Sequence, residues 1–172
     1  MDQDDFAATL REHLRQLRQE MSDAHRRHVS IADLLSDRWE TAEFYGFGEG
    51  TSCYNNVLIL GEVSVGKNTW IGPNVILDGS HELQIGDFCS IGAGVQIYTH
   101  NTVEWSTSLG AEDYEYAPTR IGNGVFIGPN SIIQMGVTIG DRAVVGAMSF
   151  VNRDVPAGAR VLGAPARESE KE

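Results

Sequence analysis

Several features that assign chains to common protein classes are scarce or absent in these 172 residues. The two cysteines, Cys53 and Cys89, are too few for a disulfide framework, and their spacing matches no metal-binding motif. No apolar run approaches the roughly 18 residues of a transmembrane helix. Positive charge is in the minority, and the net charge of −11 argues against nucleic acid or an anionic membrane as partner.

The amino-terminal end also lacks the pattern of a secretory signal peptide. Residues 1–5 are acidic, where a signal peptide begins with basic residues and continues into an apolar stretch. From these absences we expect a soluble cytoplasmic protein with no membrane insertion. The length fits one domain with an appendage.

The dominant pattern is an aliphatic residue that returns every six residues and is often followed by glycine, as in Ile71-Gly72 and Ile91-Gly92. Thirteen positions between residues 59 and 151 obey it. A six-residue period does not keep to one face of a helix, and repeated glycines each cost a helix about 1 kcal/mol. The pattern predicts short strands with the aliphatic residue inward, and a following glycine that lets the backbone turn.

Stacked repeats of this kind bury their apolar residues only against their neighbours. Three units close one triangular coil, so the thirteen units predict about four coils. Over about residues 57–165 the chain resembles the hexapeptide-repeat family, which implies an all-β, left-handed parallel β-helix. We expect this catalytic domain to span residues 51–163, followed by a carboxy-terminal tail at 164–172.

The segment before the repeats predicts helices. Residues 4–28 carry apolar side chains at three- and four-residue steps, typical of an amphipathic helix, and a second short helix is expected to begin near Ser30. Residues 1–50 are therefore expected to cap the first coil or to assemble with a neighbouring subunit, because a bare strand edge invites aggregation.

Two interruptions of the repeat are candidates for function. Eight residues separate Leu77 from Ile85, which predicts a small excursion at 78–82, and 24 separate Ile97 from Ile121, which predicts a protruding loop over 98–119. A long loop in a regular solenoid is usually functional.

His100 lies where this loop begins, within Tyr98-Thr99-His100. An imidazole can accept a proton from a hydroxyl or amine that attacks a thioester. Taken from the residues alone, a lone loop histidine is more often a surface residue. Within the hexapeptide-repeat family, however, the chain looks most like the maltose, galactoside and sugar acetyltransferase branch. In that branch the catalytic histidine stands in a similar short motif at the start of the protruding loop. The resemblance implies that His100 is the catalytic base of a homotrimer using acetyl-CoA.

The same resemblance implies which residues bind the cofactor. The family's motifs match residues 125–128, which follow the loop and contain an aromatic residue, and residues 146–149, 151–156 and 163–167 near the carboxyl end. Residues 116–167 also carry a net charge of +3 within an acidic chain. This positive charge can pair with the phosphates of coenzyme A. The implied cofactor-binding residues are Phe126, Gly128, Ala147, Ser149, Arg153 and Arg167.

The acceptor is expected to be a sugar or a nucleotide-linked sugar, modified on a hydroxyl or an amine. Stacking of the coils makes Asp78, Ser80 and His81 candidates for binding the acceptor or for orienting His100. Trp105, Tyr114 and Tyr116 on the loop are placed either to stack on a sugar ring or to anchor the loop on a neighbouring subunit.

Three alternative functions share this fold. A γ-type carbonic anhydrase needs three converging histidines on zinc, but only His81 and His100 lie outside the amino-terminal helix, so no metal site is expected. A non-catalytic β-helix scaffold lacks the loop histidine and the cofactor-binding motifs near the carboxyl end, whereas this chain has both. A serine- or antibiotic-type acetyltransferase is the nearest alternative among enzymes.

Overall fold

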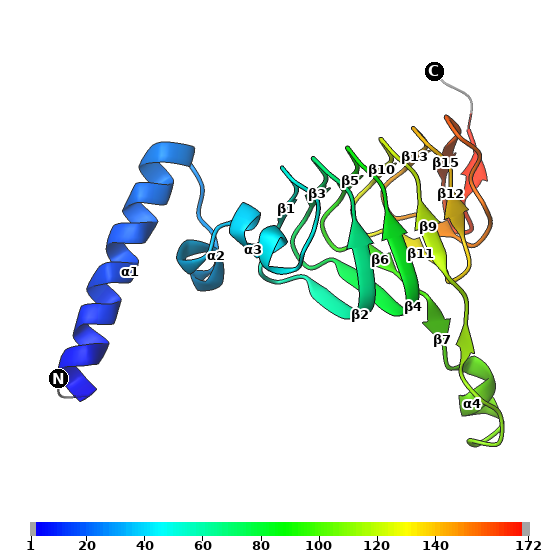
Figure 1. Cartoon of the computed structure of the whole chain (residues 1–172), viewed down its shortest axis with the longest axis horizontal. Helices are drawn as coiled ribbons and strands as arrows, with labels where there is room; N and C mark the ends of the chain where they lie inside the picture. The colour runs from blue at the N-terminus through cyan, green and yellow to red at the C-terminus, as the bar shows by residue number, and fades with distance from the viewer. Residues whose placement is uncertain (1–2, 170–172) are drawn as a thin grey trace.

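The structure is a computed structural model that describes residues 3–169. A prism of short parallel strands forms the body, the helices before it lie at one end, and an arm carrying a short helix projects from its side (Figure 1). The helices are α1 (Gln3–His25), α2 (Ile31–Leu35), α3 (Arg38–Phe44) and α4 (Val103–Thr107).

The first face of the prism is one sheet of six parallel strands with an antiparallel strand at its end. In spatial order the strands are β1 (Ser52–Cys53), β3 (Trp70–Ile71), β5 (Ser90–Ile91), β10 (Phe126–Ile127), β13 (Val144–Val145), β15 (Arg160–Leu162) and β16 (Arg167–Glu168).

The second and third faces share two long strands, which bend around the corner between these faces. These are β2 (Leu58–Val65) and β4 (Ile76–Ile85); the second face continues with β6 (Gln96–Ile97), β11 (Ile132–Ile133) and β14 (Phe150–Val151), and the third with β9 (Thr119–Ile121) and β12 (Thr138–Ile139).

The predicted parallel β-helix is therefore confirmed, but the coil count of about four was too low. The first face has six parallel strands because the coil already begins at Cys53 and continues past Val151 to Val155 and Val161. These three residues are buried although none is an aliphatic residue followed by glycine. An inward position requires only a side chain that fits the narrow interior, so a motif search misses such units.

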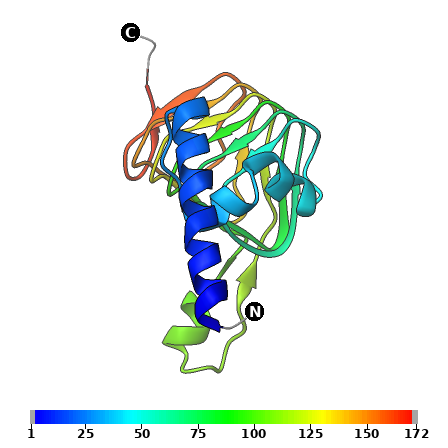
Figure 2. The same ribbon diagram turned by 90° about the vertical axis from the view of Figure 1, so that its left-hand side faces the viewer.

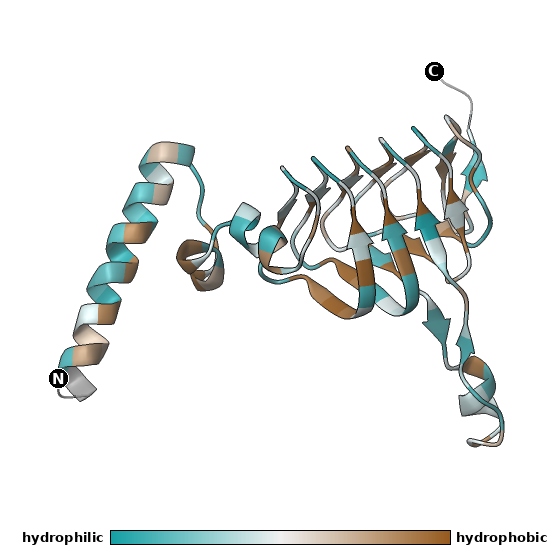
Figure 3. Ribbon diagram, viewed as in Figure 1, coloured by the Kyte–Doolittle hydropathy of each residue, from teal (hydrophilic) through white to brown (hydrophobic). Residues whose placement is uncertain are grey.

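The core is a column of inward aliphatic side chains, one from each face of each coil. Ile71, Leu77, Ile91 and Ile97 are fully buried, as are their equivalents in later coils. Apolar segments accordingly recur at equivalent places along the prism (Figure 3). Full burial of such a side chain contributes about 1.5–3 kcal/mol, so the stacked column is the main source of stability.

The glycines that follow the aliphatic residues do not make the turns, contrary to the prediction. Gly72 and Gly92 lack a positive φ, whereas Asn74 and Gly94, two residues later, have φ of 58° and 69° and turn the corner. A Cβ on Gly92 would lie 2.7 Å from the backbone nitrogen of Pro129 in the next coil. Glycine is needed here because adjacent coils approach too closely for a side chain.

The amino-terminal helices behave differently from one another. The expected second helix is split, because Asp37 caps a new helix, α3, through a capping box with Glu40. Helix α3 packs on β1, and Ala42 and Phe47 join the core at the first coil. Helix α1 packs mainly against α2 and stands off the prism (Figure 1). In the view along the prism, α1 crosses in front of the coils (Figure 2). A role for residues 1–50 in assembly stays a prediction.

The excursion expected at residues 78–82 is absent, because β4 runs through it without a break. Asp78 and Gly79 pair with Leu60 and Gly61 of β2, and the register shifts after Gly61. The two extra residues are thus absorbed in a strand that bends around the corner. Within residues 3–169, no helix is long and apolar enough to cross a membrane.

The close approach at Gly92 leads to a stability prediction. We expect Gly92→Ala to lower the free energy of unfolding by about 1–3 kcal/mol, because the new methyl group overlaps the backbone of the next coil. Chemical denaturation at fixed protein concentration measures this. Ser90→Ala, on the neighbouring strand β5, is the matched control; equal stability of both variants would contradict the argument.

Candidate active site

His100 lies at the base of the arm. After β6 ends at Ile97, the chain enters β7 (His100–Asn101), which pairs antiparallel with β8 (Glu115–Tyr116) on the returning side of the arm. His100 lies opposite Tyr116, and its side chain is 24% exposed. The strand pairing fixes the backbone of His100, while the ring stays accessible from outside.

The buried carboxylate of Asp78 contacts the His100 ring. Leu77 and Ile97 are partners in adjacent coils, so the residues after them lie at the same corner. The Nδ1 atom of His100 is 2.5 Å from Oδ2 of Asp78, whose side chain is fully buried. Of the two roles expected for Asp78, this geometry favours the partner of His100 over a ligand of the acceptor.

Four groups hold the Asp78 carboxylate in place. It accepts hydrogen bonds from the Ser80 amide (3.0 Å) and hydroxyl (2.5 Å), and from the Thr99 amide (2.9 Å), besides its contact with His100. Burial raises the pKa of Asp78, but the bonds from Ser80, Thr99 and His100 outweigh burial and lower the pKa below its usual value. The carboxylate is therefore ionised at neutral pH.

An ionised Asp78 determines the tautomer of His100. A carboxylate only accepts hydrogen bonds, so the Nδ1 atom of His100 must carry the shared proton. The Nε2 atom of the neutral ring then keeps its lone pair. His100 is thus prepared to accept a proton at Nε2 from a group that approaches from the exposed side.

Aromatic side chains of the arm surround His100. Tyr114 and Tyr116 lie nearly parallel to its ring, with centroids 6.4 and 6.1 Å away. Trp105 packs edge-on against Tyr114 at 5.5 Å, and His81 lies 6.3 Å from Tyr116. Trp105, Tyr114 and His81, all expected at the acceptor site, therefore gather around His100 within one chain.

Arg153 lies at the same corner of the prism as His100. The amide of Tyr98 donates to the carbonyl of Ile133, and that of Gln134 to Val151, so the corner continues through successive coils to Arg153. Arg153 and Arg167 are exposed and line one hollow of about 180 Å³ at the end of the prism. The structure thus brings these two predicted cofactor residues together.

The other predicted cofactor residues lie at a different corner, where the first face meets the second. Phe126 is 42% exposed on β10, and Ala147 is exposed in the next coil, beside Gly128. The amide of Gly128 donates to Val145, and the buried Ser149 hydroxyl donates to Gly146, so both groups serve the coil. One chain alone does not place this set beside His100.

Ser80 was among the residues expected to orient His100, whereas Thr99 was missed by the sequence reasoning. Ser80 and Thr99 orient the carboxylate of Asp78, and the Thr99 hydroxyl also accepts from the His81 amide at 3.1 Å. Small hydroxyl residues flanking Asp78 and His100 were the available signal. Among the described residues, no cluster of three or more histidine, cysteine, aspartate or glutamate side chains is arranged to hold a metal ion.

Comparison with known proteins agrees with this architecture. Residues 118–153 match the family described as bacterial transferase hexapeptide (six repeats), and residues 62–99 match the hexapeptide repeat of succinyl-transferase. Both models describe hexapeptide-repeat transferases, so the chain carries the repeat of that family. The resemblance inferred from the repeat is thereby confirmed.

Two curated relatives cover the β-helix. The chain is 34% identical over 106 residues to galactoside O-acetyltransferase of Escherichia coli, which covers 61% of the chain and 52% of that protein. It is 45% identical over 105 residues to nodulation protein L of Rhizobium meliloti, covering 61% of the chain and 57% of the relative. The match thus spans little more than half the length of either relative.

A solved structure matches nearly the whole chain. A hexapeptide-repeat-containing acetyltransferase of Vibrio cholerae is 29% identical, with a TM-score of 0.69 over 95% of this chain and 90% of the other. The same kind of protein from Vibrio cholerae O1 biovar eltor was solved with acetyl coenzyme A (27% identity, TM-score 0.57, 92% and 87% covered).

The lowered pKa of Asp78 predicts how stability depends on pH. Because the pKa is lower in the folded protein than in the unfolded chain, where it is about 3.9, the carboxylate stabilises the fold above about pH 4. This contribution is lost as the pH falls through the folded pKa.

We therefore expect Asp78→Asn to lower the free energy of unfolding by about 2 kcal/mol at pH 7. Urea denaturation should show the gap between wild type and variant shrinking toward pH 3. Asp141→Asn is the control, because this exposed carboxylate accepts a single backbone hydrogen bond, from the Asn123 amide, and its loss should change stability less. A gap for Asp78→Asn that is independent of pH would refute the assignment.

Proposed function

We propose that the protein transfers an acyl group, most simply acetyl, from acyl-CoA to a hydroxyl or amine of a small acceptor such as a sugar or nucleotide-linked sugar. The contact between His100 Nδ1 and the buried Asp78 carboxylate carries this proposal. It supplies an oriented base at an accessible position, which a scaffold protein does not need. The relationship to galactoside O-acetyltransferase supports the acceptor class.

In the proposed reaction His100 acts as the general base. The acceptor oxygen or nitrogen attacks the thioester carbonyl carbon while its proton passes to Nε2 of His100. The imidazolium that forms is stabilised by the Asp78 carboxylate on the opposite ring nitrogen. When the carbon–sulfur bond breaks, the same proton passes to the departing thiolate, which yields free coenzyme A and the acylated acceptor. No covalent enzyme intermediate is needed.

The aromatic side chains beside His100 suit a saccharide acceptor. Tyr114 and Tyr116 form a ring-lined wall next to the base, and Trp105 supports Tyr114 edge-on. Aromatic faces pack against the apolar faces of sugar rings, and the tyrosine hydroxyls offer hydrogen bonds. We infer that these contacts hold the acceptor hydroxyl or amine near Nε2 of His100.

The donor is proposed to run along the corner that joins His100 to Arg153. The exposed guanidinium groups of Arg153 and Arg167 then meet the phosphates of coenzyme A at the hollow they share. This direction places the thioester at His100 and the nucleotide toward the end of the prism.

A homotrimer accounts for the second set of cofactor residues. Phe126 and Ala147 lie at another corner of the same chain, so they reach the donor only from a neighbouring subunit. The second face between the corners carries exposed Leu58 (50%) and Ile132 (37%), which favours burial against another copy. We therefore propose that the donor lies between two subunits.

Removal of the base tests the proposal most directly. We expect His100→Ala to lower kcat by about 10² to 10⁴, with acetyl-CoA still bound, because the acceptor proton then has no positioned base. Thiol release from acetyl-CoA, assayed with a panel of sugars, amino sugars and nucleotide sugars, measures it. His13→Ala, on α1, is the control, and unchanged turnover in His100→Ala would overturn the mechanism.

The donor orientation predicts a different effect for Arg153. We expect Arg153→Ala to raise the KM for acetyl-CoA about tenfold with little change in kcat, since its phosphate contact is equally strong in the ground and transition states. Steady-state kinetics at saturating acceptor separate the two constants. The exposed Arg142→Ala serves as control, and an effect on kcat alone would contradict the proposed direction of the donor.

A further inference from the structure

A crevice lies between the amino-terminal segment and the first two coils, away from His100. It consists of two hollows, of about 290 and 580 Å³, that share Arg27, Val29, Asp33, Arg38 and Tyr54. The larger one lies within the range of small-molecule sites, about 300–1,000 Å³. None of the residues assigned to acyl transfer lines either hollow.

Arg38 is prepared for an anion. It is half-buried, and its guanidinium carbon lies 4.5 Å from the Trp39 ring centroid and 5.4 Å from that of Tyr54. Stacking on two rings holds the guanidinium plane while its N–H donors stay free. In the described part of the chain, Arg38 forms no ion pair. The cost of ordering this side chain is thus already met before a ligand arrives.

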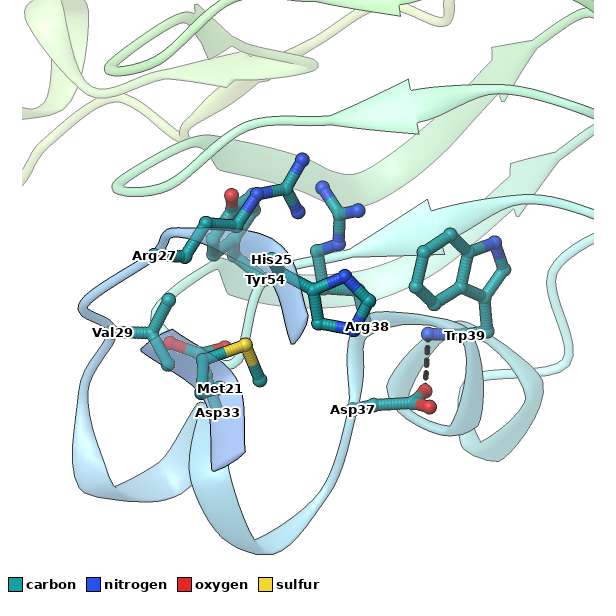
Figure 4. Close-up of a pocket in the computed structure, with 9 residues that line it drawn as sticks. All are labelled: Met21, His25, Arg27, Val29, Asp33, Asp37, Arg38, Trp39 and Tyr54. Carbon is teal, nitrogen blue, oxygen red and sulfur yellow. Dashed lines mark hydrogen bonds between the residues drawn. The ribbon is translucent and has the colours of Figure 1, made fainter. Parts of the chain in front are cut away.

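A second guanidinium belongs to the same crevice. Arg27 lines both hollows and, among residues 3–169, also has no ion-pair partner. In Figure 4, the guanidinium groups of Arg27 and Arg38 point to the same side of the pocket. His28 adds a further basic side chain to the larger hollow. Two arginines that face one space match the geometry of a phosphate.

The carboxylates of the crevice are engaged by neutral donors. Asp33 accepts from the Ser30 hydroxyl at 2.6 Å and from the backbone and side-chain nitrogens of Asn55 at 3.0 and 3.2 Å. These bonds tie α2 to the first coil. Asp37 lines only the smaller hollow, where its Oδ1 caps α3. The larger hollow therefore holds two arginines against one structurally occupied carboxylate.

Aromatic rings complete the larger hollow. Tyr54 and Trp70 line it with their rings edge to face, 6.4 Å apart. The two ring planes are nearly perpendicular, so they form an apolar corner next to the guanidinium groups, into which a sugar or a base can pack.

We propose that this crevice binds a phosphorylated small molecule with a ring. Its phosphate contacts Arg27 and Arg38, and its ring packs on Tyr54 and Trp70. The site is separate from acyl transfer and does not depend on the function proposed above.

Glucose 6-phosphate and inorganic phosphate are the probes for the first experiment, with glucose for comparison. Binding is followed by calorimetry and by tryptophan fluorescence at constant ionic strength. We expect saturable binding of glucose 6-phosphate that glucose does not displace, and weaker saturable binding of phosphate. Absence of saturable binding for both phosphate probes overturns the proposal.

Variants locate the binding on the chain. Arg38→Gln and Arg27→Gln should each weaken glucose 6-phosphate binding tenfold or more, as expected for a lost charge-assisted hydrogen bond. Arg18→Gln on α1 and Arg153→Gln at the proposed donor site should leave it unchanged. Arg27 is exposed, so its variant reports on binding even if Arg38→Gln is unstable. Equal affinity of wild type and Arg27→Gln refutes the site.

The tryptophans supply an independent readout. Trp39 and Trp70 both lie at the crevice, so the double variant Trp39→Phe/Trp70→Phe should abolish most of the fluorescence change on binding, whereas Trp105→Phe, on the arm, should preserve it. The opposite result places the ligand at the arm and overturns the proposal.

Discussion

The close stacking of each coil on the next is the constraint on which the rest of the structure depends. Amides of one coil donate to carbonyls of the next throughout the prism, and glycines such as Gly92 let the backbones approach to this distance. The stacking buries a continuous column of aliphatic side chains and aligns the corners of successive coils. Residues far apart in sequence thereby meet at one corner. Both the contact of Asp78 with His100 and the place of Arg153 follow from this alignment.

The candidate site shows how a regular solenoid acquires chemistry. The arm leaves the coil after Ile97, and its strands β7 and β8 pair with each other. This pairing fixes the backbone of His100 beside the prism while the ring remains accessible. The coil below contributes a carboxylate that is buried and bound by Ser80 and Thr99. A carboxylate at this depth stays ionised only because those donors replace water. The prism thus supplies the buried carboxylate, and the arm supplies the histidine ring and the aromatic side chains around it.

Much of the fold followed from the sequence, but the details failed for physical reasons. The six-residue repeat predicted the parallel β-helix, and it underestimated the coils because Cys53 and Val161 fill inward positions without the motif. The turn-making residue was misplaced, since the glycine signal reflects crowding between coils. The prediction of an excursion after Leu77 was wrong, because the two extra residues are accommodated within β4, which bends around the corner. Counting the repeats in threes would already have separated Phe126 from His100.

The sequence by itself determined a coil of short stacked strands, because an aliphatic residue at every sixth position makes each unit repeat the same packing problem. It also determined that the repeat breaks at His100. Only the tertiary structure decided which carboxylate reaches that histidine, since Asp78 lies 22 residues away and the strand between them carries two extra residues. Likewise, the crevice of Arg27 and Arg38 exists only where separate helices meet the first coil. Contacts between distant segments depend on register and on strand bending, and neither is written in the local pattern.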